Sequence, residues 1–136
     1  MYEVFEHTAD LGLRIRAPTL DALFSDAARG LFALLIANLE AAEGVQTKTY
    51  QLGPDESDYL LADWLRELLY TFDADRLVLV EFDVRLDEKG LRAVCRGEPL
   101  DPARHNVDHE VKAITYHELK VVAAPDGWLA EVIVDV

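Results

Sequence analysis

Residues 59–72 constrain the fold most, because their apolar side chains cover more than one face of a helix. The apolar residues at helical spacing are Tyr59, Leu60, Leu61, Trp64, Leu65, Leu68, Leu69 and Phe72. A helix at a protein surface needs only one apolar stripe. This pattern therefore predicts a central helix that packs on a sheet and has a second contact surface. We expect Asp55 to cap it, Asp58 to lie in its first turn, and residues 73–76 to end it.

A second helical stripe precedes this one, and the remaining apolar segments read as strands. Thr19 is placed to cap a helix that ends near Ile36. The expected strands are residues 2–7, 12–16, 45–52, 77–86, 91–100, 110–116 (a strand or a short mixed segment), 119–123 and 129–135. Turn signals join two pairs of these strands into hairpins. We predict an α+β fold: a single domain over 1–136, with a mixed, largely antiparallel sheet and two helices packed on one face.

The chain is strongly acidic, with 26 Asp and Glu against 13 Lys and Arg and a formal net charge of −13. A surface of this sign repels phosphates, which argues against nucleic acid as the primary partner. It remains compatible with cations, with a basic protein partner, or with solubility as its only role.

Cysteine usage and the first residues indicate a cytoplasmic protein. The single cysteine, Cys95, cannot form an internal disulfide. It alternates with Leu91 and Ala93 on one side of an expected strand, so we expect a buried thiol rather than a nucleophile. Residues 1–6 are too acidic for a signal peptide, and no apolar run approaches membrane length, so no membrane association is expected.

The last strand ends in Asp135-Val136, which brings two carboxylates together on an apolar segment. Like charges at one strand end repel unless a cation or a cluster of donors lies between them. Asp10 adds a third oxygen donor if the fold brings the two ends of the chain together. Calcium and magnesium prefer such oxygen ligands. The simpler alternatives are a core strand with its last Asp in solvent, and an Asp10 that only caps a turn.

Motifs for other chemistry are weak or missing in the sequence. His7, His105, His109 and His117 offer imidazoles, but their spacing fits no zinc pattern. The chain contains no Gly-rich phosphate loop and no Gly-x-Ser-x-Gly elbow. His109 with Glu110 and Lys112 is suited to acid–base work, although such residues in loops are more often surface hydrogen-bonding groups.

Four blocks of the sequence resemble the archease family and occur in the family's order. They are Glu6-His7-Thr8-Ala9-Asp10-Leu11-Gly12, the helix from Asp58 to Tyr70, the segment from Glu110 to His117, and Val132-Ile133-Val134-Asp135-Val136. Together they reach from the first expected strand to the last residue. The last block departs only conservatively, since Val134 and Val136 replace residues that are more often aromatic or Ile.

The resemblance implies a non-catalytic accessory protein of the GTP-dependent RNA ligase that joins tRNA halves. Such proteins help the ligase histidine become guanylylated and allow multiple turnover. The family's divalent ion, taken to be calcium, maps to Asp10, Asp135 and the main-chain oxygen of Val136. His7 and Lys112 are candidate contacts with the ligase, and Lys112 is equally well read as an ordinary surface lysine. No direct binding of nucleic acid is expected.

Two other functions remain open from the sequence. One is a stand-alone metal-dependent phosphoesterase that uses Asp10, Asp135 and His109. The other is a chaperone-like helper in RNA processing. The shortage of basic residues argues against an enzyme that cleaves RNA, because such an enzyme needs a surface that attracts phosphates.

Overall fold

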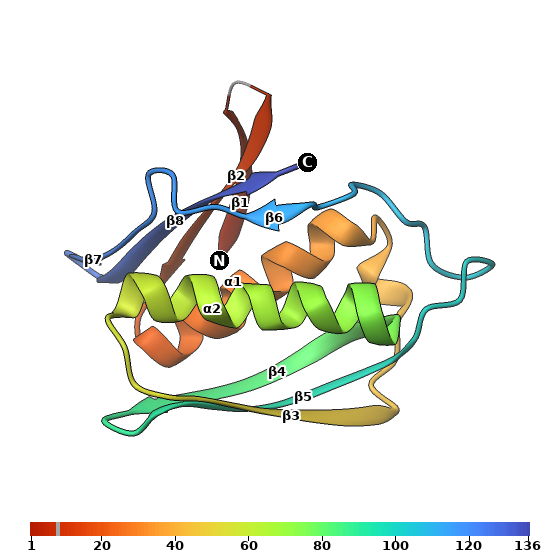
Figure 1. The fold of residues 1–136 in the computed structure, drawn as a ribbon, viewed down its shortest axis with the longest axis horizontal. Coiled ribbons are helices and arrows are strands. Elements are labelled where there is room, and N and C mark those ends of the chain that lie inside the picture. The colour runs from red at the N-terminus through yellow and green to blue at the C-terminus, as the bar shows by residue number, and fades with distance from the viewer. Residues whose placement is uncertain (8) are drawn as a thin grey trace.

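Two helices lie between two antiparallel sheets, an upper and a lower sheet in Figure 1. The computed structural model describes residues 1–7 and 9–136, so Thr8 of the first motif lies outside the described residues. The upper sheet consists of β1 (Tyr2–His7), β2 (Asp10–Ala17), β6 (Ala113–Ile114), β7 (Lys120–Ala124) and β8 (Gly127–Asp135). The lower sheet consists of β3 (Gln46–Leu52), β4 (Leu77–Asp87) and β5 (Gly90–Pro99). The helical elements are α1 (Leu20–Leu35), η1 (Leu39–Ala41), α2 (Ser57–Tyr70) and η2 (Thr71–Asp75).

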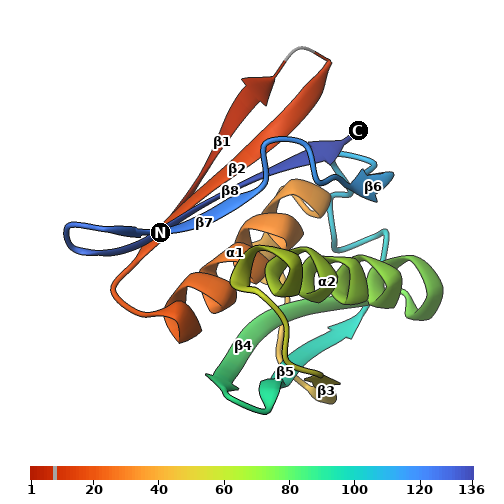
Figure 2. The same ribbon diagram turned by 60° about the vertical axis from the view of Figure 1, so that its left-hand side comes forward.

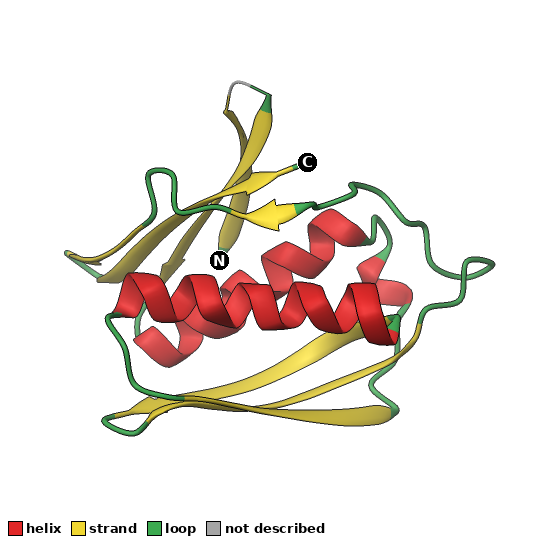
Figure 3. Ribbon diagram, in the orientation of Figure 1, coloured by secondary structure: helices red, strands yellow, loops and turns green. Residues whose placement is uncertain are grey.

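The predicted α+β class and its two helices are confirmed, and the strands are divided over two sheets rather than one. Figures 2 and 3 show the helices as a middle layer with a sheet on either side. Apolar periodicity indicates which side of each strand is buried, and it carries no information on which strands lie side by side. The sequence pattern predicts a single sheet with both helices on one face. The structure instead has a layer of helices between two sheets.

Helix α2 owes its central position to the wide apolar surface seen in the sequence. Its buried residues are Leu60, Leu61, Ala62, Trp64, Leu65, Leu68 and Leu69. The Trp64 ring meets Tyr50 of the lower sheet edge-on, with 5.3 Å between the ring centroids. Its indole Nε1 donates to the carbonyl oxygen of Phe24 in α1 at 3.1 Å. One side chain thus joins both helices to the lower sheet.

The helix ends follow the predicted signals in part. Thr19 caps α1, since its hydroxyl oxygen accepts from Ala22 N at 3.1 Å. Asp58 lies in the first turn of α2 as expected, but Asp55 is not its cap. Glu56 occupies that position, and Asp55 instead accepts from the Glu56 amide at 2.8 Å. Element boundaries set by one residue depend on backbone geometry that composition does not specify.

The remaining elements agree closely with the sequence pattern, except where the sequence itself was ambiguous. Both predicted hairpins form, as β4–β5 and β7–β8. The segment 110–116 contributes only the short β6.

Cys95 is fully buried on β5, and burial raises the pKa of its thiol to about 12. None of the described helices combines the length and the apolar character needed to cross a membrane.

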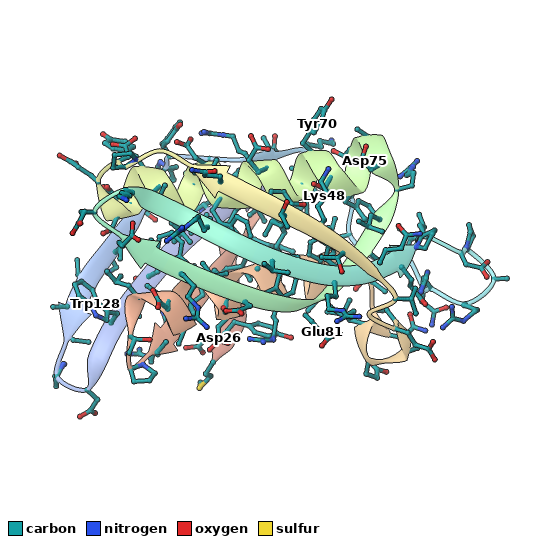
Figure 4. The ribbon with its side chains drawn as sticks, turned by 90° about the horizontal axis from the view of Figure 1, so that it is seen from below. Asp26, Lys48, Tyr70, Asp75, Glu81 and Trp128 are labelled. Atoms are coloured by element: carbon teal, nitrogen blue, oxygen red, sulfur yellow. The ribbon has the colours of Figure 1, made fainter. Side chains whose placement is uncertain are left out.

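The outer face of the lower sheet is polar, and several of its charged side chains form ion pairs. Figure 4 shows this face, with Lys48 on β3 and Asp75 in η2 close to one another. Their Nζ and Oδ2 atoms are 3.3 Å apart. Side chains of this kind form a solvated surface that stabilises the protein only slightly. The groups predicted to carry function lie on the upper sheet instead.

Candidate functional site

The upper sheet brings Asp10 and Asp135 to the end of the same strand ladder. β2 and β8 pair antiparallel, and the last pair in their register is Leu11 with Val134. Asp10 and Asp135 are the next residues on each strand, so they are neighbours across the ladder. Leu13 and Val134 are buried toward α1. Since successive residues of a strand alternate between faces, both carboxylates belong to the outer face, away from the helices.

The main chain around Asp135 is fixed from its other side by β6. Asp135 pairs with Ala113, and the Lys112 amide donates to the Asp135 carbonyl oxygen at 2.8 Å. Asp10, Asp135 and Val136 are all half-buried. Neither carboxylate has a hydrogen bond or an ion pair with a side chain among the residues that the structure describes. Two carboxylates held at one ladder end, with no cationic side chain of the described residues paired to them, suit a hard divalent cation.

His7 lies beside Asp10 and contacts His117 and Glu118, and nothing in the sequence indicated that these two residues meet His7. His7 pairs with Asp10 in the β1–β2 hairpin. Its Nε2 is 3.0 Å from Oε2 of Glu118, and its ring meets that of His117 edge-on with a centroid separation of 5.2 Å. Glu118 and His117 come from the loop between β6 and β7. Their place next to His7 could not be read from the sequence, because the two segments lie at opposite ends of the chain.

The other predicted candidates lie apart from this cluster. Lys112 is exposed and lines a groove between α2 and β6 with Arg66 and Tyr70. The backbone amide of His109 donates to Leu34 at the end of α1, and its ring is 3.8 Å from Asp108. Among the described residues no contact joins His109 to either carboxylate of the predicted metal site.

His105 has a structural role. It is buried, and its Nε2 lies 2.6 Å from Oε1 of Glu98, while its Nδ1 accepts from the Asp101 amide at 2.9 Å. Burial alone raises the pKa of a carboxyl, but the hydrogen bond with His105 and the nearby charge of Arg104 outweigh it and hold the pKa of Glu98 below its usual range. These contacts fix the loop that follows β5.

A charged network covers the outer face next to the cluster. Arg14 stacks its guanidinium over Phe5 at 4.6 Å from the ring centroid and donates to Glu131 at 2.9 Å. The hydrogen bond from Lys120 and that from Arg14 lower the pKa of the Glu131 carboxyl, although burial opposes them. Phe5 in turn lies over Gly12, where an added Cβ would be 2.1 Å from the ring. Gly12 of the first motif therefore allows this close packing.

Similarity to known proteins extends over the whole chain. The model of the "Archease protein family (MTH1598/TM1083)" matches residues 2–136. A protein archease from Methanopyrus kandleri is 39% identical and covers 98% of this chain and 98% of its own. One from Pyrococcus abyssi is 37% identical, over 99% of this chain and 98% of its own.

Solved structures agree with the architecture. The solution structure of protein 1598 from Methanobacterium thermoautotrophicum superimposes with a TM-score of 0.84 at 28% identity, covering 99% of this chain and 98% of that one. A crystal structure from Thermotoga maritima, described as an archease and possible chaperone, gives a TM-score of 0.70 at 19% identity over 100% of this chain and 98% of that one. The latter bears on the fold alone. On the full-length match, this chain belongs to the archease family.

Proposed function

We propose that this archease is a non-catalytic accessory protein that binds a divalent ion and activates a GTP-dependent RNA ligase. It promotes guanylylation of the ligase and its multiple turnover in tRNA splicing. The observation that carries the proposal is the placement of Asp10 and Asp135 at one ladder end, on an outer face that a partner protein can reach.

The ion in this proposal is calcium, held by the carboxylates of Asp10 and Asp135 and a main-chain oxygen of Val136. This set consists only of oxygen donors, which calcium prefers. When bound, the ion supplies positive charge that can orient phosphate oxygens. The protein keeps the set in place through the β2–β8 ladder on one side and the Lys112 amide on the other.

The partner in this proposal is a protein rather than RNA. The net charge of −13 disfavours direct binding of nucleic acid and favours a ligase surface with exposed basic residues. The backbone of His7 pairs with Asp10 and the backbone amide of Lys112 donates to Asp135, and these two residues are the proposed contacts with the ligase. The alternative of a phosphoesterase that uses His109 is weaker, because among the described residues the ring of His109 lies near Asp108 and makes no hydrogen bond or ion pair with Asp10 or Asp135.

Guanylylation of the ligase tests the proposal directly. Labelled GTP is incubated with the ligase of the same organism, with and without this protein, and the covalent ligase–GMP adduct is followed with time. We expect faster adduct formation and repeated ligation cycles only when the archease is present. Asp10→Ala and Asp135→Ala should abolish the effect while leaving the circular dichroism spectrum unchanged.

The matched control is Glu88→Gln, which removes one negative charge from an exposed turn far along the sequence from both ladder ends. It should activate the ligase like the wild type. RNA incubated with the archease alone should be neither cut nor joined. Equal adduct formation and equal turnover with and without the archease would refute the proposal.

A further inference from the structure

The three side chains of His7, His117 and Glu118 form a compact group of metal-binding atoms. One ligand atom from each lies within 4.8 Å of the others. The His7 Nε2 to Glu118 Oε2 distance is already 3.0 Å. Ligand atoms around a tetrahedral zinc ion, bound at about 2.1 Å, are about 3.4 Å apart. Small rotations of the side chains are therefore enough to place the three atoms around one ion.

The loop that supplies two of these ligands is held in shape by its own contacts. The Thr115 amide and hydroxyl both donate to the carbonyl oxygen of Ile133 on β8, at 3.0 and 2.8 Å. The Thr115 hydroxyl oxygen also accepts from the His117 amide at 3.2 Å. Glu118 has a left-handed backbone, with φ of 53°, which a side chain other than glycine rarely adopts. This conformation turns the chain back toward β7 at the point where Glu118 meets His7.

His7 is the most enclosed member of the group. Its side chain is 25% exposed, and its buried Nδ1 has no hydrogen-bond partner among the described residues. Its Nε2 points to Glu118, while the side chain of Glu118 is largely exposed. A groove of about 510 Å³, lined by Phe5, Glu118 and Glu131 among others, opens beside the group. Because His117 and Glu118 are both exposed, solvent can reach their ligand atoms.

The donor set separates this group from the carboxylate pair of the proposed calcium site. Imidazole nitrogens suit zinc and its neighbours among the transition metals, whereas calcium takes oxygen ligands. Two histidines and one carboxylate leave a fourth tetrahedral position open, as in zinc sites that keep a water or an external ligand. We propose that His7, His117 and Glu118 form a second metal site, which binds Zn²⁺ and leaves one position open to solvent.

Calorimetric titration of Zn²⁺ into the untagged full chain, in the presence of saturating Ca²⁺, tests the site. We expect one Zn²⁺ per chain. His117→Ala and Glu118→Gln should each weaken the affinity by roughly tenfold or more, since even outer partners of a metal site contribute this much. The visible absorption of bound Co²⁺, used as a probe, should show tetrahedral coordination in the wild type and lose that signature in both variants.

Two control variants separate this site from other sources of binding. His109→Ala removes an exposed histidine outside the group and should leave the Zn²⁺ affinity unchanged. Asp135→Asn should weaken Ca²⁺ binding and leave Zn²⁺ binding unchanged, which keeps the result independent of the proposed function. The inference is overturned if Zn²⁺ binds the wild type and the His117→Ala variant equally, or if it does not bind the wild type at all.

Discussion

Replacing Asp135 by Asn should change the stability of this protein in opposite directions with and without calcium. In the ion-free protein, two negative side chains meet at the end of the β2–β8 ladder, and no cationic side chain among the described residues offsets them. Asn keeps the shape of the side chain and removes one charge. The Lys112 hydrogen bond is unaffected, because it is made to the main chain of residue 135.

The magnitude follows from the spacing of neighbouring strands. Side chains across from each other or on the diagonal of an antiparallel pair are about 5 to 8 Å apart. At half-exposed positions with a water-like dielectric, repulsion over that range is about 0.5 to 0.8 kcal/mol. Asp135→Asn should therefore stabilise the ion-free protein by roughly that amount. With calcium at about one hundred times its dissociation constant, the wild type gains about 2.7 kcal/mol, which the variant largely lacks.

The assay is urea unfolding followed by circular dichroism, once with a chelator and once with excess calcium. We expect the variant to be the more stable protein with the chelator, and the wild type to be the more stable by about 2 kcal/mol with calcium. Glu88→Gln controls for the general relief of a net charge of −13 and should behave alike in both buffers. The reasoning fails if the difference between Asp135→Asn and wild type has the same sign and size in the two conditions.

Three further outcomes follow from buried groups. The pKa of Glu98 is lowered in the folded protein, so its pairing with His105 stabilises the fold at pH values above the unfolded pKa of about 4.3. This stabilisation is lost as the pH falls through the folded pKa. The free energy of unfolding of Glu98→Gln, measured from pH 3 to 7, should be lower than that of the wild type at neutral pH and should decline less on acidification. Trp64→Phe should lower the free energy of unfolding by about 1 to 3 kcal/mol, because the indole hydrogen bond to the carbonyl oxygen of Phe24 is lost and the smaller ring leaves a cavity in the core. An unchanged urea midpoint would contradict this. Cys95 should resist a thiol-reactive probe in the native protein and react in denaturant, because it is 0% exposed and its pKa is about 12. Equal labelling rates in both conditions would show that the thiol is accessible in the native protein.

The secondary structure was largely readable from the sequence because each element carries its own period. The wide apolar surface of α2 predicted a second contact surface, and that surface proves to be a separate sheet. What periodicity cannot supply is the pairing of strands. β3 lies beside β5, and β2 lies beside β8, although the two strands of each pair are far apart in the chain. The exact cap of α2 was missed for a different reason: Asp55 is a residue type common at helix N-termini, but the backbone enters the helix one residue later, after Glu56.

The candidate site residues also differ in whether the sequence alone could indicate them. Asp135 could be selected from the sequence because its carboxylate stands at the end of an apolar strand, and Asp10 because it belongs to a polar cluster between the first two expected strands. The grouping of His7 with His117 and Glu118 could not, since it depends on where the loop after β6 crosses the outer face of the sheet. Zinc-ligand patterns rely on short spacings within one segment of the chain, so they do not detect ligands that come from two distant segments.

The place of β8 in the upper sheet has a consequence for how the chain reaches its native state. β2 is made early, yet one of its two neighbouring strands is the last one in the sequence. The hydrogen bond between Arg14 and Glu131 joins residues 117 positions apart. Closing so long a loop is slow compared with forming local contacts. During synthesis the edge of β2 that pairs with β8 is therefore expected to stay unpaired until β8, far along the chain, has also left the ribosome.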